Sequence, residues 1–206
     1  MLRGFCLSKE LELHVAIPRF PDERLGMLPE KFFTALGHLH YAFTSLEVQM
    51  ASVVNQYITV GYDSSVHWPM QDKVSAILGG LRMETAKDTI NRLLRVSEAP
   101  QEVQDFVKRI FQQIGEIQYF RNRLAHYHTG RWLRKPGQFV NTDMEVAREK
   151  TKTVTFSFSY DALEAARHDL HLISRLIDDL FDFEVESFDL QIPAWQFKST
   201  MLIKES

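Results

Sequence analysis

The sequence contains a single cysteine, Cys6, among its 206 residues. One thiol cannot form an intramolecular disulfide and cannot supply a cysteine-rich zinc site. No apolar run approaches the roughly 18 residues that suggest a membrane-spanning helix. Near the N-terminus, Lys9, Glu10 and Glu12 interrupt the chain before the apolar core of a signal peptide develops. These absences predict a soluble protein of a reducing, cytoplasmic compartment.

A strong charge of either sign is also missing, because the formal net charge is -3 at pH 7. This value argues against a generally basic nucleic-acid binder, although a local basic patch can still bind RNA. The chain has no glycine-rich phosphate loop, no HExxH metal motif and no convincing nucleophile elbow. Its length and its apolar fraction of 45% suit one globular domain with a full core, spanning residues 1–206.

Long segments with apolar residues at helical spacing dominate the sequence. We expect helices over residues 29–61, from about 81 or 84 to 96, 101–127 and about 160–182. The first has one continuous apolar face, formed by Leu36, Leu39, Phe43, Leu46, Met50, Val53 and Tyr57. His40 and Glu47 lie one heptad apart at the edge of this face. The simplest interpretation makes them boundary residues with hydrated tips.

The helix expected over residues 101–127 has one arginine at an unusual position. Projected at about 100° per residue, Arg121 falls near the centre of its apolar stripe. A guanidinium there needs a carboxylate partner, a water-filled space or a bound anion. Gly115, Asn122 and His126 project together onto a different face, where the glycine would let another helix approach closely.

Beyond Gly130 the pattern changes to that of strands. Residues 131–140 read as strand, turn and strand, residues 141–152 as a polar loop, and residues 154–158 alternate as a further strand. We therefore predict a mainly α protein, a bundle of four to five helices with a small antiparallel hairpin or sheet inserted before the last long helix. The helical core would cover about residues 29–182, with extended arms at 1–28 and 183–206.

An arginine followed five positions later by a histidine occurs twice, as Arg121 with His126 and as Arg123 with His128. Spacing alone is a weak signal. The first pair has more support, because the polar Asn122 follows Arg121 and the pair closes a long amphipathic helix. In the second pair an apolar leucine takes the place of that polar residue.

The string Arg121-Asn122-Arg123-Leu124-Ala125-His126 resembles the ribonuclease motif of the HEPN superfamily (higher eukaryotes and prokaryotes nucleotide-binding domains). The resemblance implies a helical bundle and a metal-independent, cofactor-free endoribonuclease of toxin–antitoxin or phage-defence type. His126 would be the general acid or base, Arg121 would hold the scissile phosphate, and Asn122 would orient the phosphate or the imidazole. The resemblance also implies a homodimer whose two motifs meet at the interface.

Basic and aromatic residues continue past this motif without an acidic residue. Such a mixture suits single-stranded RNA, through phosphate neutralisation and base stacking. The candidate RNA-binding residues are Arg123, Tyr127, His128, Arg131, Trp132, Arg134 and Lys135. The alternative is a positively charged helix end followed by a solvated hairpin.

Other interpretations remain open. Arg121 could form a structural ion pair with Glu47, leaving His126 exposed. The chain could also be a non-catalytic module that binds RNA or a nucleotide, or that docks on an antitoxin or a nucleotidyltransferase. His168 and His171 lie three residues apart and could bind a metal, but a solvated helix face is the favoured interpretation and no metal is expected.

Overall fold

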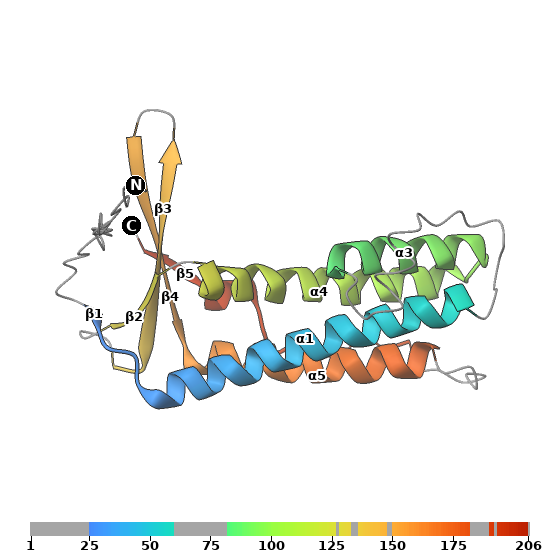
Figure 1. Cartoon of the computed structure of the whole chain (residues 1–206), viewed down its shortest axis with the longest axis horizontal. Helices are drawn as coiled ribbons and strands as arrows, with labels where there is room; N and C mark the ends of the chain where they lie inside the picture. The colour runs from blue at the N-terminus through green and yellow to red at the C-terminus, as the bar shows by residue number, and fades with distance from the viewer. Residues whose placement is uncertain are drawn as a thin grey trace, which may run out of the picture.

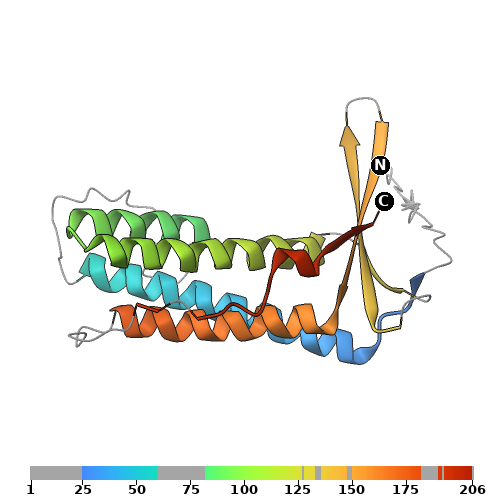
Figure 2. The same ribbon diagram turned by 180° about the vertical axis from the view of Figure 1, so that it is seen from behind.

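The structure is a computed structural model that describes residues 25–59, 82–126, 128–132, 136–147, 150–181, 190–191 and 193–205. Within these ranges the helices are α1 (Glu30–Thr59), α3 (Met83–Val96), α4 (Gln101–His126) and α5 (Tyr160–Phe181). They form an elongated body in which α1 runs beside α5 and α3 beside α4 (Figures 1 and 2). The helix boundaries follow the sequence closely, since Pro29 directly precedes α1 and Pro100 directly precedes α4.

An antiparallel sheet lies at one end of the helical body (Figure 1). Its five strands follow chain order: β1 (Leu25–Gly26), β2 (His128–Trp132), β3 (Gln138–Ala147), β4 (Lys150–Ser159) and β5 (Ile203–Glu205). Gly137, in the turn between β2 and β3, has φ +79°, a left-handed conformation that glycine adopts without a steric penalty. The two edge strands come from the segments expected to be extended arms.

The expected polar loop over residues 141–152 was wrong. Strands β3 and β4 pair continuously from Gln138 opposite Ser159 to Ala147 opposite Lys150. The polar composition misled because a two-stranded ribbon satisfies its backbone groups by pairing and needs no buried face.

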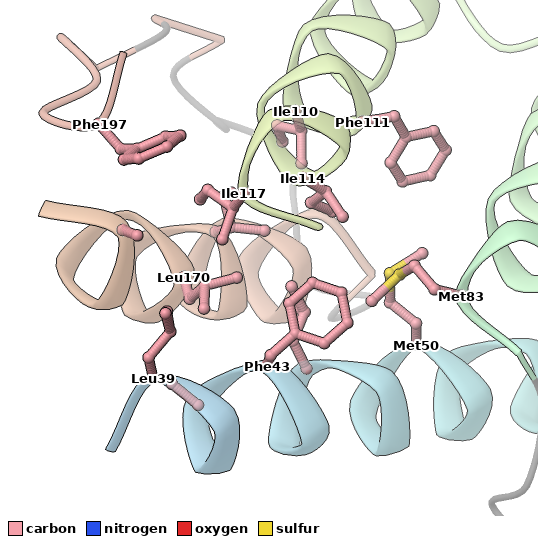
Figure 3. Packing of buried hydrophobic residues seen from close by; sticks show 14 of the residues in the cluster. Leu39, Phe43, Met50, Met83, Ile110, Phe111, Ile114, Ile117, Leu170 and Phe197 are labelled. Carbon is pink, nitrogen blue, oxygen red and sulfur yellow. The ribbon is translucent and has the colours of Figure 1, made fainter. Parts of the chain in front are cut away.

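The core is built where the helices meet, and the predicted apolar faces supply most of it. In Figure 3, Leu39, Phe43 and Met50 stand on the side of α1 that faces the other helices. Leu39 points toward Leu170 of α5, Phe43 toward Ile114 of α4, and Met50 lies beside Met83 of α3. Phe197, which follows α5 by many residues, also packs into this core.

The order of the helices and strands confirms the mainly α fold with a sheet inserted before the last long helix. Over the described ranges, none of the helices combines the length and apolarity needed to span a lipid bilayer.

A buried carboxylate attaches the C-terminal segment to the helices. Asp169 of α5 is completely buried and accepts hydrogen bonds from the backbone N–H groups of Gln196 (3.0 Å) and Phe197 (2.9 Å). The side-chain amide of Gln113 donates to the same carboxylate at 2.9 Å and to the Phe197 carbonyl oxygen at 2.9 Å. These bonds hold Phe197 in the core and bring the following residues to the sheet.

Replacing Asp169 with alanine should release this segment. We expect the free energy of unfolding to fall by about 3 kcal/mol or more, because each buried donor left without an acceptor costs about 1–3 kcal/mol. Asp169→Asn, which keeps one carbonyl acceptor, should lose less. Urea denaturation measures both changes, and hydrogen exchange at Gln196 and Phe197 should accelerate. Asp179→Ala, an exposed acid on the same helix, is the control; equal losses at the two sites would contradict the role of Asp169.

Candidate functional site

Arg121, in the last turns of α4, reaches across to α1. Its Nε donates a hydrogen bond to Nδ1 of His40 at 3.3 Å, and its Nη1 donates to Oδ1 of Asn122 at 3.1 Å. The guanidinium carbon lies 5.2 Å from the ring centre of Phe43, which points from α1 toward α4 (Figure 3). Arg121, Asn122 and His40 are all partly buried. The arginine is thus fixed on two sides by neutral polar atoms and packed on an aromatic ring.

The hydrogen bond from Arg121 requires the ring of His40 to be neutral. Nδ1 can accept a hydrogen bond only when it carries no proton, so the ring is neutral and its proton sits on Nε2. Partial burial lowers the pKa of His40 below its ordinary value, and the positive charge of Arg121 lowers this pKa further. Burial raises the pKa of Glu47, while the charge of Arg121 opposes that rise.

No direct ion pair joins Arg121 to Glu47 among the residues that the structure describes. The alternative interpretation, in which this pair pins the two helices, therefore fails in its simple form. Instead, His40, one heptad before Glu47 on α1, accepts the Nε–H of the guanidinium. Arg121 acts on Glu47 through its electric field rather than by contact. Sequence reasoning noted His40 but gave it no role, because a lone histidine at a helix edge belongs to no motif.

The position of Arg123 contradicts the prediction that this residue binds RNA. Its side chain is buried, because the residue is only 6% exposed. Its guanidinium carbon lies 4.1 Å from the ring centre of Phe156 on β4 and 5.8 Å from that of Tyr119. Its carbonyl oxygen accepts a hydrogen bond from the side-chain amide of Asn141 at 3.1 Å. Arg123 therefore joins α4 to the sheet, and as folded it offers no open surface to a nucleic acid.

His126 is the last residue of α4 and is exposed. Within the described part of the chain it forms no hydrogen bond with Arg121, whose bonds go to His40 and Asn122. On the face that it shares with Asn122, a Cβ atom added at Gly115 would meet no atom of the described residues within 4 Å. Tyr119 on the same face is 51% exposed. The two ends of the predicted motif thus point in different directions within one chain.

The remaining candidate RNA-binding residues gather around β2, and the structure describes them incompletely. Arg131 is exposed on this strand. His128 and Trp132 also lie in β2, but their side chains are outside the described residues. Tyr127, Arg134 and Lys135 lie wholly outside them.

His168 of α5 contacts Asp169, and His171 is exposed. Nδ1 of His168 lies 3.4 Å from Oδ1 of Asp169, whose carboxylate already accepts backbone hydrogen bonds from Gln196 and Phe197. Across the described ranges, the structure shows no group of three or more histidine, cysteine, aspartate or glutamate side chains that could hold a metal ion. The carboxylate of Asp169 therefore has a structural role, which is to attach the C-terminal segment to α5.

No protein-family model, curated protein or solved structure matches this chain. The functional interpretation accordingly depends on the residues and on the geometry at the contact between α1 and α4.

Replacing the buried Arg123 with alanine should destabilise the fold. We expect the free energy of unfolding to fall by about 2–4 kcal/mol, because a desolvated cation–π contact contributes about 2 kcal/mol and truncation also removes packing. Thermal or urea denaturation measures the change. Arg131→Ala, which removes an exposed arginine from the adjacent strand, should stay within about 0.5 kcal/mol of the wild type. A stability unchanged in the Arg123 variant would contradict the buried position.

The charge of Arg121 should be visible in the titration of its neighbours. NMR should find the pKa of His40 below 6.5, and Arg121→Gln should raise the pKa of both His40 and Glu47. The stability contributed by neutral His40 is full above pH 6.5 and is lost as the pH falls through its lowered pKa. For Glu47 the sign is opposite, since its contribution is full below pH 4.5 and is lost as the pH rises. If Arg121→Gln moves neither group, the proposed geometry is wrong.

Proposed function

We propose that this protein is a metal-independent endoribonuclease of HEPN type, toxin-like or defence-like, whose active sites are completed at a homodimer interface in the cytoplasm. The observation that supports the proposal most directly is that Arg121 is hydrogen-bonded to neutral partners. Its two hydrogen-bond partners, His40 Nδ1 and Asn122 Oδ1, are neutral, so its positive charge remains available to an anion. The string from Arg121 to His126 supplies the imidazole that RNA cleavage needs.

The proposed chemistry uses the 2′-hydroxyl of RNA as the nucleophile. His126, acting as a general base, takes the 2′-hydroxyl proton while the 2′-oxygen forms a bond to phosphorus. The bond from phosphorus to the 5′-oxygen breaks, solvent water supplies the proton that this oxygen takes, and a cyclic phosphate remains. Arg121 stabilises the negative charge that builds up on the phosphate oxygens. No step requires a metal ion or a cofactor.

A second copy of the chain is part of the proposal because Arg121 and His126 do not meet within one protomer. The open face of α4, with Gly115 and His126, would adjoin the neighbouring subunit and bring its His126 to this subunit's Arg121. Exposed apolar residues on the outer side of α1 would extend the interface; these are Phe33, Tyr41 and Val48. Arg131 on β2 would contact the RNA backbone.

The separation of Arg121 from His126 also favours a second candidate function. A module that binds RNA or a nucleotide without cleaving it needs the charge of Arg121 but does not need His126. Such a module would dock on a partner, for example an antitoxin or a nucleotidyltransferase. The two functions predict opposite outcomes when His126 is replaced.

The ribonuclease proposal predicts cleavage of mixed RNA by the purified protein in the presence of EDTA. We expect Arg121→Ala and His126→Ala each to reduce the rate by about 100-fold or more, the usual range for a lost charge-stabilising donor and for a lost acid–base group. Arg109→Ala and His171→Ala remove an exposed arginine and an exposed histidine elsewhere and should cleave normally. RNA binding that persists without cleavage, in wild type and His126→Ala alike, would establish the binding module instead.

Mixing the two inactive variants tests the composite site. Co-expressed Arg121→Ala and His126→Ala subunits should form mixed dimers in which one site has both wild-type residues. Activity should recover to about one quarter of the wild-type value, because random pairing makes half of the dimers mixed. Recovery would support a site shared between subunits. If wild type cleaves but the mixture does not, the two residues act within one chain.

A further inference from the structure

The neutral side chain of His40 orients Arg121, although α1 also carries the carboxylate of Glu47. Nε of Arg121 donates to His40, and within the described residues Glu47 forms no direct ion pair with it. A carboxylate in the place of His40 would orient the guanidinium and also neutralise it, because an arginine–carboxylate pair uses the charge of both groups. An imidazole that accepts through Nδ1 orients the guanidinium without placing an opposite charge directly against it.

We infer that His40 is a positioning residue, which together with Asn122 holds the guanidinium of Arg121 as a preorganised receptor for one phosphodiester oxygen. This inference rests on the proposed function, since it takes RNA phosphate as the anion. Preorganised donors avoid the free-energy cost of reorientation when the anion arrives or its charge grows. His40 does not touch the RNA in this account; it acts through Arg121.

The hydrogen bonds around the guanidinium identify the group that receives the anion. Nε is engaged by His40 and Nη1 by Asn122, and the ring of Phe43 lies 5.2 Å from the guanidinium carbon. Among the described residues, none accepts a hydrogen bond from Nη2. Both N–H groups of Nη2 and the second N–H group of Nη1 therefore remain for phosphate oxygens, and the two bonds already made set the plane in which they point.

Two variants of almost equal shape separate orientation from charge. In His40→Asn, the side-chain amide places an acceptor near the position of Nδ1 and stays neutral. In His40→Asp, a carboxylate oxygen occupies that position and adds a negative charge. His40→Leu removes the acceptor altogether. His38→Asp adds the same negative charge on an exposed part of α1 and controls for net charge.

The measurement is binding of a short RNA oligonucleotide whose 2′-hydroxyl groups are methylated. This probe keeps its phosphodiesters but cannot be cleaved, so binding is measured separately from catalysis. We expect His40→Asn and His38→Asp to bind within about twofold of wild type. His40→Asp and His40→Leu should each bind about tenfold more weakly, the factor that accompanies loss of one charge-assisted hydrogen bond. Circular dichroism should show the helical content of each variant unchanged.

Wild-type affinity in His40→Leu would overturn the inference, and so would an equally weakened His40→Asn. A second readout, the NMR signal of the Arg121 Nε–H group, needs no ligand. This signal should be protected from exchange in wild type and in His40→Asn and lost in His40→Leu. If Arg121→Gln leaves oligonucleotide binding unchanged, the proposed phosphate contact fails; the Nε–H signal then decides whether His40 still positions the arginine.

Discussion

The rotation of α4 about its own axis is the constraint on which the candidate site depends. Burial of Ile110, Ile114 and Ile117 fixes that rotation, because turning the helix would expose its apolar stripe to water. Each following residue then points about 100° from the one before. Phe120 enters the core, Arg121 reaches α1, Arg123 meets the sheet, and His126 lies on the open surface.

Three charged groups near the core are stabilised in three different ways. Asp169 accepts hydrogen bonds from two backbone N–H groups and from the side-chain amide of Gln113. These bonds satisfy the carboxylate oxygens and anchor the C-terminal segment. Arg123 lies over the ring of Phe156, where the quadrupole of the ring attracts its charge. Arg121 is oriented by His40 and Asn122, neither of which carries a charge in this arrangement. Only the third arrangement keeps the charge available to a ligand, and this difference singles out Arg121.

Sequence patterns predicted the helices well, since the apolar faces of α1 and α4 are continuous and Pro29 and Pro100 mark their starts. They failed for residues 141–152, where polar composition suggested a loop although β3 and β4 pair along their whole length. They also assigned Arg121 to the middle of the apolar stripe, whereas it lies at the border of the core and Arg123 is the more deeply buried arginine. An ideal helical wheel cannot place such residues, because it contains no information about what the neighbouring elements offer on each side.

The sequence by itself determined the mainly α class, the ends of the long helices, the turn at Gly137 and the string from Arg121 to His126. These features follow from local spacing and from the conformational preferences of single residues. Only the tertiary structure decided that His40 faces Arg121, that Glu47 does not pair with it directly and that Phe156 covers Arg123. His40 and Arg121 are 81 positions apart in the chain. Contacts at such separations depend on how helices pack side by side, and no local pattern encodes that arrangement.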